Sequence, residues 1–164
     1  MSPPSLIGAL DADGETYTAR PCNRAGDPVV QVPELGKALH GYHHGDVELL
    51  VAAILRHDWE SINPWSAGHC LDTGLRTLGT AEDVEPHRGV GYHLAESALH
   101  PVTGRLSDRP DPRHRWLYLF NAGMLRVYRN QDDHRWAPTY AVATADLDRP
   151  VDLAGPGVVD TDTG

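Results

Sequence analysis

The hydrophobic pattern is clearest between residues 46 and 64, which read DVELLVAAILRHDWESINP. Apolar side chains recur there at helical spacing, at Val47, Leu50, Val51, Ile54 and Leu55. The spacing predicts an amphipathic helix that packs one face on a core and ends near His57-Asp58-Trp59. Asp46 stands where its carboxylate can accept hydrogen bonds from backbone N–H groups of the first helical turn.

The N-terminal segment predicts a β-hairpin. Residues 6–10 and 15–20 flank Asp11-Ala12-Asp13-Gly14, in which Asp can open a tight turn and Gly can close it. A short helix is expected next, from Pro33 to Leu39 or His40, because proline is well tolerated at the first position of a helix.

Aromatic and aliphatic residues are densest toward the C-terminus. Residues 116–120 and 124–128 predict a second hairpin around the turn Asn121-Ala122-Gly123, and shorter strands are expected at 89–94 and 139–144. One face of the first strand of this hairpin is expected to be core, since alternation places there Trp116, Tyr118 and Phe120.

Three segments follow neither a helical nor an alternating pattern. Pro and Gly interrupt residues 61–88, so we expect a long loop that either acts as a lid or contains short elements. Residues 101–112 predict another polar loop. Residues 148–164, rich in Asp, Gly and Pro, predict a flexible acidic tail.

Together these elements predict one α+β domain over residues 1–147. Its architecture would be a twisted antiparallel sheet with two helices packed on one face, because the helices are inserted as a group between strands. A chain of 164 residues is long enough for one core and short for two ordinary domains.

Charge and cysteine content narrow the classes of partner. The formal net charge is −9, and the basic residues, 13 Arg and Lys37, are scattered, so nucleic acid is not an expected partner. The longest apolar run, residues 49–55, is far too short to span a membrane. Cys22 and Cys70 are the two cysteines and no apolar leader follows the start, so a cytoplasmic protein is expected.

Clustered histidines raise the question of a metal site. A divalent metal could be held by His43, His44 and Asp46, with His40 nearby, although Gly41 and Gly45 leave the side-chain directions open. His57-Asp58 resembles the His-Asp doublet of metal phosphohydrolases. For the first cluster, the alternative interpretation is a solvated helix end with adventitious affinity for nickel or zinc. For His57-Asp58 it is a helix C-terminus in which Asp58 caps the following turn and Trp59 packs beneath it. No other cofactor is expected.

Other side chains are candidates for recognition or catalysis. Trp59 and Trp65 lie beside the long 61–88 segment, where a rigid scaffold could present a binding loop. An anionic ligand could be bound by the arginines around Pro110 and Pro112, namely Arg105, Arg109, Arg113 and Arg115, although a solvated loop is the default interpretation. His69-Cys70 could pair a base with a thiolate, but adjacent side chains rarely face one another, so a structural thiol is the default.

Residues 19–28, which read ARPCNRAGDP, carry a family resemblance. The segment resembles the motif Ala-Arg-Tyr-Val-His-Trp-Asp-Gly-Tyr-Pro of an uncharacterised family of small bacterial and phage proteins. Matches occur at Ala19, Arg20, Gly26 and Pro28. Asn23 stands in place of the family's His and Ala25 in place of its Asp, so a site at the motif would be lost or changed here. The resemblance implies a related fold and no known activity.

Three classes of function remain open. The first is a non-enzymatic binding or inhibitor module, of an immunity or phage counter-defence type, which engages a protein or small-molecule partner through residues 61–88 and 105–115. The alternative is a metal-dependent hydrolase that uses the cluster between His40 and Asp58. A third is an assembly protein that associates through edge strands. The oligomeric state does not follow from the sequence.

Overall fold

The computed structural model describes residues 4–24, 26–74, 83–132, 134–153 and 158. Within this part of the chain one sheet is formed by the strands β1 (Ser5–Leu10), β2 (Thr16–Cys22), β3 (Trp59–Ile62), β4 (Val84–His87), β5 (Gly91–Leu94), β6 (Val102–Arg105), β7 (Trp116–Asn121), β8 (Met124–Gln131) and β9 (Arg135–Ala143). The helical elements are α1 (Pro28–Gly36), the π-helical η1 (Lys37–Tyr42), α2 (Val47–Ile54), α3 (Pro64–Thr73) and the short 3-10 turn η2 (Thr144–Asp146).

The strand order is β4-β5-β3-β2-β1-β7-β8-β9, and β6 pairs with β2 beside this path. Most neighbours are antiparallel, but β1 pairs with β7 and β2 with β3 in parallel. The expectation of a purely antiparallel sheet was therefore wrong. A parallel neighbour requires a crossover, and the helical segment α1-η1-α2 supplies the one between β2 and β3. A mixed α/β fold with one dominant sheet is what the structure shows.

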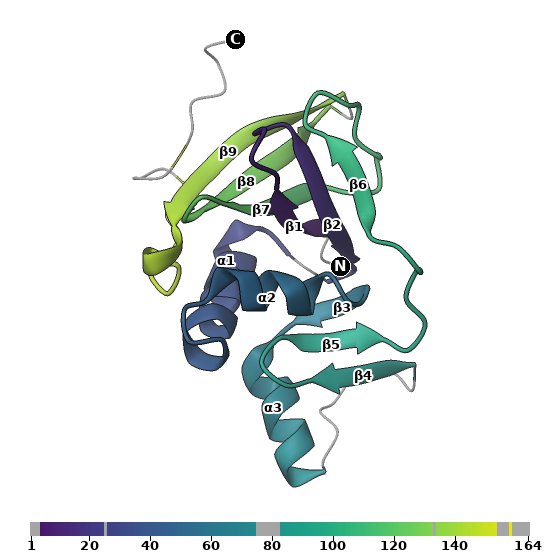
Figure 1. Ribbon diagram of the computed structural model, residues 1–164, viewed down its shortest axis with the longest axis vertical. Coiled ribbons are helices and arrows are strands. Elements are labelled where there is room, and N and C mark those ends of the chain that lie inside the picture. Colours follow the sequence, from purple (N-terminus) through teal and green to yellow (C-terminus); the bar gives the residue numbers. More distant parts are fainter. Residues whose placement is uncertain (1–3, 25, 75–82, 133, 154–157, 159–164) are drawn as a thin grey trace.

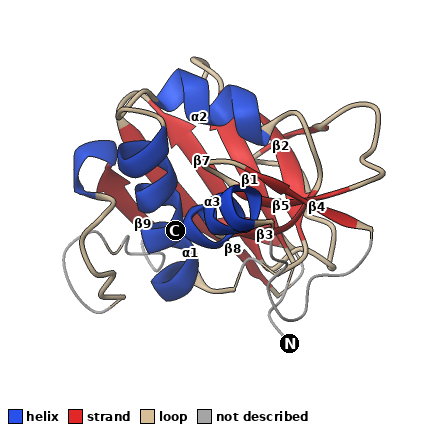
Figure 2. Cartoon of the chain, turned by 90° about the horizontal axis from the view of Figure 1, so that it is seen from below, coloured by secondary structure: helices blue, strands red, loops and turns tan. Residues whose placement is uncertain are grey.

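The principal core lies between the sheet and the helical segment α1-η1-α2. In Figure 1 both α1 and α2 lie beneath β1, β7 and β8, and Figure 2 views the sheet from this helical side. The predicted face of β7 is confirmed as core, because Trp116, Tyr118 and Phe120 all belong to this cluster. The alternate residues Leu117 and Leu119 are equally buried in a second core on the opposite face.

Both predicted hairpins are confirmed. In the first, the Asp13 carboxylate accepts hydrogen bonds from the backbone N–H groups of Glu15 and Thr16, each at 2.9 Å. In the second, Ala122 and Gly123 have φ values of 49° and 77°, the paired left-handed conformation of a two-residue turn. The α2 prediction is confirmed with its cap, since an Asp46 carboxylate oxygen lies 3.2 Å from the Leu49 amide nitrogen.

The predicted loop over residues 61–88 proves to contain short elements: the end of β3, all of α3 and β4. Asn63 caps α3 by accepting a hydrogen bond from the Ser66 amide, Pro64 occupies its first turn, and Gly74 ends it with φ 71°. Pro and Gly mark the boundaries of this helix, so they do not break it. Residues 75–82 of the predicted loop lie outside the described residues. Likewise, β6 occupies part of the loop expected at 101–112.

The expected short helix at Pro33 begins earlier, at Pro28, and contains Pro33 in its interior. At the other end of the chain, Leu147 is buried, and core contacts continue into the predicted tail, where Val151 packs against the same cluster. Val158 forms an isolated bridge with Tyr140. The rest of the predicted tail, residues 154–157 and 159–164, lies outside the described part. None of the described helices has the length and apolar character needed to cross a membrane.

Candidate binding surface

Trp65 is the most prominent exposed aromatic side chain of α3, with 65% of its surface accessible. Its indole stacks on the His69 imidazole, with ring centroids 5.2 Å apart and an interplanar angle of 4°. The contact follows from the helix, because residues four apart lie one above the other on the same face. The stack covers one face of the indole and leaves its outer side open to solvent.

Two further segments flank this face of α3. A Cβ atom added at Gly68 would lie 3.8 Å from the Tyr42 hydroxyl oxygen, so the ring of Tyr42 passes close to the helix. One turn further, Asp72 forms an ion pair with Arg88, whose guanidinium donates to the carboxylate. This hydrogen bond is the main cause of a lowered Asp72 pKa. We call the set Trp65, His69, Asp72, Tyr42 and Arg88 the α3 surface.

The opposite side of α3 anchors the helix to the sheet. Ser66 Oγ lies 2.7 Å from the Tyr92 hydroxyl of β5 in a buried hydrogen bond. Ala67 packs with Val84 and Tyr92 in a small separate core. Since these contacts fix the helix against β4 and β5, the α3 surface is presented by a rigid support.

Trp59, predicted as part of a recognition surface, is instead fully buried in the principal core. Its indole Nε1 donates to the Ile54 carbonyl oxygen at 2.8 Å. The recognition-surface prediction for Trp59 was wrong, whereas the alternative interpretation, in which Trp59 packs beneath the helix end, is confirmed, because β3 begins at Trp59 and carries the indole into the core. Of the two tryptophans expected beside the 61–88 segment, only Trp65 is accessible to a partner.

The predicted arginine site lies far from α3. Figure 1 places the segment after β6 and α3 at opposite ends of the molecule, so α3 and the arginines that follow β6 do not form one surface. Arg113 forms two-pronged hydrogen bonds to the Asp111 carboxylate at 2.7 to 3.1 Å. This pairing lowers the Asp111 pKa and occupies the guanidinium. Arg109 and Arg115 are exposed on the same segment.

The predicted metal ligands face different partners. His40 Nε2 lies 2.8 Å from the Thr144 carbonyl oxygen, and His43 Nδ1 lies 2.8 Å from that of Ala38. Asp46 caps α2, and His44 is exposed with φ 56°. Within the described ranges no three His, Cys, Asp or Glu side chains are grouped to hold a metal.

Asp58, the other member of the expected doublet, is engaged elsewhere. Its Oδ1 accepts a hydrogen bond from Arg20 Nη1 at 3.1 Å, and its Oδ2 accepts one from the Ala98 amide at 3.0 Å. The neighbouring His57 turns toward β4 and β5, where it meets His87 and His93. The two side chains of the doublet therefore do not converge on a common ion.

Neither cysteine has the surroundings of a nucleophile. Burial raises the pKa of the Cys22 thiol to about 12, so the thiolate is scarce at neutral pH. Cys70 faces the buried side of α3, whereas the His69 ring stacks on Trp65 on the exposed side. The adjacent pair His69-Cys70 is thus split between two faces of the helix.

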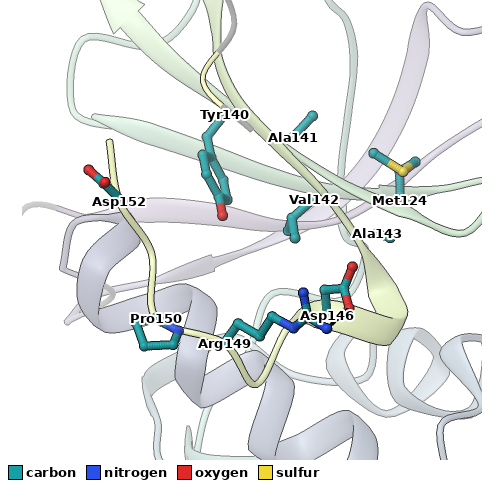
Figure 3. A pocket seen from close by; sticks show the side chains of 9 residues that line it. All are labelled: Met124, Tyr140, Ala141, Val142, Ala143, Asp146, Arg149, Pro150 and Asp152. Carbon is teal, nitrogen blue, oxygen red and sulfur yellow. Dashed lines mark ion pairs between the residues drawn. The ribbon is translucent and has the colours of Figure 1, made fainter. Parts of the chain in front are cut away.

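Two hollows lie away from α3. One of about 390 Å³ separates β9 from the segment after η2. In Figure 3 the Tyr140 ring reaches into it from β9, with Pro150 and Asp152 opposite. Two of its three charged residues, Asp146 and Arg149, pair with each other at 3.4 Å. A second, of about 490 Å³, lies between α2 and the turns of the two hairpins and has mostly apolar walls. Neither hollow contains a residue of the α3 surface.

Sequence reasoning found Trp65 but missed the rest of the α3 surface. A signal was present: Asn63-Pro64 and Gly74 mark the two ends of a helix, and residues 65, 68, 69 and 72 then share one face. The approach of Tyr42 and Arg88 could not be inferred, because it depends on how η1 and the β4–β5 turn pack against that helix.

Comparison with known proteins found no matching family model, no matching curated protein and no matching solved structure.

Proposed function

We propose that this chain is a non-enzymatic binding module that engages a protein partner through the α3 surface, in an inhibitory or immunity-type role. The observation that carries the proposal is the exposed Trp65 indole, held in place by its stack on His69. Tryptophan is enriched among the residues that dominate binding energy in protein interfaces. Preorganisation favours binding, because little side-chain freedom is lost when the partner docks.

The surroundings of the indole support a protein partner over a small molecule. Trp65 projects from the outer face of a helix, and small ligands favour concave sites. Tyr42 and the Asp72–Arg88 pair supply polar and charged groups beside it. An aromatic centre with a polar rim is the usual anatomy of a protein interface.

The chain's other features are consistent with this role. The two cysteines are free thiols, as expected for the proposed cytoplasmic residence. The family resemblance at residues 19–28 remains a proposal of common fold. Its best-matched polar residue, Arg20, is buried in an ion pair, so in this chain the position has a structural role.

Affinity capture from native cell extract tests the proposal. The full chain, Trp65→Ala and Leu71→Ala are immobilised in equal amounts, and the retained proteins are quantified by mass spectrometry. Leu71 is a matched control because it is an exposed apolar residue on the same helix but on a different face. We expect a protein retained by the wild type and by Leu71→Ala and lost with Trp65→Ala. Identical retention by all three would overturn the proposal.

A further inference from the structure

Three imidazole rings meet where the chain leaves α2 and passes the β4–β5 hairpin. The His57 and His93 rings stack with centroids 3.9 Å apart and planes inclined by 12°. The His87 ring stands edge-on to both, at 5.9 Å from His57 and 6.2 Å from His93. The stack therefore joins the end of a helix to a hairpin more than 25 residues away in the sequence.

Trp59 lies against all three rings. Its indole is edge-on to His57, His87 and His93 at 5.9, 5.6 and 5.9 Å. The same indole is fully buried and donates to the carbonyl of Ile54, the last residue of α2. The imidazoles thus contact the buried Trp59 indole, whose hydrogen bond to Ile54 forms only when the end of α2 is packed against it.

The hydrogen bonds of two rings indicate where an added proton would go. His87 Nδ1 lies 3.1 Å from the Arg88 carbonyl oxygen, and His93 Nδ1 lies 2.9 Å from that of Leu94. A carbonyl oxygen only accepts, so each Nδ1 carries the hydrogen of the neutral ring. Protonation would therefore add the second proton of each ring at Nε2.

Charged groups from the described segments around the cluster affect these rings. Of the acids, Glu85 Oε2 lies 3.7 Å from His93 Nε2, while Asp58 is already paired with Arg20. The cations that disfavour protonation of His57 are Arg20 and Arg56, and Arg56 also disfavours protonation of His87. Burial is the main cause that lowers the pKa of both His57 and His87. His93 lowers both pKa values further, and His87 also lowers that of His57, whereas the hydrogen bond to the Arg88 carbonyl partly raises the pKa of His87.

We propose that His57, His87 and His93 form a proton-sensitive latch, which holds the C-terminal end of α2 against the β4–β5 hairpin at neutral pH and releases it on acidification. Neutral rings can stack at 3.9 Å, whereas two imidazolium ions at that distance repel each other. Among the described residues, the carboxylate that forms an ion pair with a ring of the cluster is that of Glu85, and it can offset a single charge. Separation of the His57–His93 stack relieves the repulsion and exposes Trp59.

Hydrogen exchange of the Trp59 indole N–H, measured by NMR on the full chain, tests the latch. Its protection factor, relative to the intrinsic exchange rate at each pH, is compared at about pH 7.5 and about pH 5.5. We expect protection in the wild type to fall about tenfold or more on acidification, while the Leu119 amide in the core strand β7 stays protected. Concerted loss at Trp59 and Leu119 would mean global unfolding and would overturn the latch.

Two variants make the test specific. His57→Phe keeps an aromatic ring for stacking but cannot be protonated, so Trp59 should stay protected at the lower pH. His87→Gln provides a second route should the first variant fold poorly, and it should weaken the pH effect. His134→Gln removes an exposed histidine from the β8–β9 turn and should behave as the wild type. An unchanged pH response in both cluster variants, or none in the wild type, would overturn the proposal.

The latch adjoins the α3 surface, because His87 precedes Arg88, which pairs with Asp72. Under the proposed function, acidification would therefore also weaken partner binding. The exchange measurement needs no partner, so its failure would leave the proposed function standing, and failure of partner capture would leave the latch standing.

Discussion

Arg20 Nη1 lies 3.1 Å from Asp58 Oδ1, although the two residues are 38 positions apart in the sequence. Both side chains are largely buried, with 5% and 13% of their surfaces exposed. Arg20 also donates to the Leu55 carbonyl at 2.8 Å and to the Ala98 carbonyl at 2.7 Å. One guanidinium therefore ties β2 to the end of α2 and to the segment after β5.

Replacement of Arg20 by Met should destabilise the fold strongly. The change leaves the Asp58 carboxylate buried without its counter-ion, for which a loss of about 3–5 kcal/mol in the free energy of unfolding is expected. Urea denaturation measures it. The matched control is Arg24→Met, because the Arg24–Glu60 pair is more exposed and should contribute about 1 kcal/mol or less. Equal losses in the two variants would contradict a central role for the Arg20 pair.

The Asn63 cap should stabilise α3 and with it the α3 surface. Asn63→Ala removes the acceptor for the Ser66 amide and should lower the free energy of unfolding by about 1 kcal/mol. Asn63→Asp keeps an acceptor oxygen and should retain most of the stability. Thermal unfolding followed by circular dichroism distinguishes the two variants, and a similar loss in both would argue against the cap.

Glycine at position 89 should be required for Tyr42 to pack closely against the β4–β5 turn. A Cβ atom at this position would lie 2.8 Å from Tyr42 Cβ, and the backbone has φ 83°. Gly74 has a similar φ of 71° but open space around it. Gly74→Ala therefore isolates the backbone strain, of about 1 kcal/mol. In chemical denaturation, Gly89→Ala should lower the free energy of unfolding more than Gly74→Ala does. The reverse order would show that the Tyr42 contact does not restrict the side chain at position 89.

Stability should decline as the pH falls below neutrality. The pKa values of His57, His87 and His114 are lowered in the folded chain, mainly by burial. Below the ordinary value of 6.5 the unfolded chain takes up protons that the native rings resist. The contribution of these three rings to the free energy of unfolding is therefore fully present above pH 6.5. It is lost as the pH falls from there through their lowered pKa values.

His114 isolates one part of this dependence, because it lies outside the latch. His114→Gln removes a titrating group, so its urea midpoint should change less than that of the wild type between about pH 7 and about pH 5. His134→Gln serves again as the exposed control. A pH dependence identical to the wild type in His114→Gln would show that the buried ring does not contribute.

The Cys22 thiol should be unreactive in the native protein. Its pKa of about 12 keeps the thiolate population small at pH 8, and the side chain is fully buried. In a Cys70→Ala background, alkylation of Cys22 by iodoacetamide should proceed only as fast as the chain unfolds, and added urea should accelerate it. Rapid labelling without denaturant would contradict the burial of this group.

Local sequence chemistry predicted much of the fold. The turn at residues 11–14, the turn at 121–123 and the Asp46 cap were all correctly predicted, because each depends on the conformation of a few neighbouring residues. The parallel pairing of β1 with β7 could not be predicted this way, since more than 100 residues separate the strands and only tertiary packing brings them together.

The candidate site likewise contains residues that local sequence could indicate and residues whose positions depend on tertiary packing. Trp65 was identified from its position beside a long irregular segment, whereas the true location of Trp59 depends on β3 entering the core. The stack of His57 on His93 joins a helix end to a distant hairpin. The spacing of residues along the sequence does not predict such a contact, because it carries no information about how two distant segments pack together.

The most direct test of the account is the affinity of the captured partner for the wild type, Trp65→Ala and Leu71→Ala, measured by isothermal titration calorimetry. We predict that Trp65→Ala raises the Kd by about 30-fold or more, and that Leu71→Ala changes it by about threefold or less. Equal affinities for the three proteins would contradict the assignment of the α3 surface as the binding site.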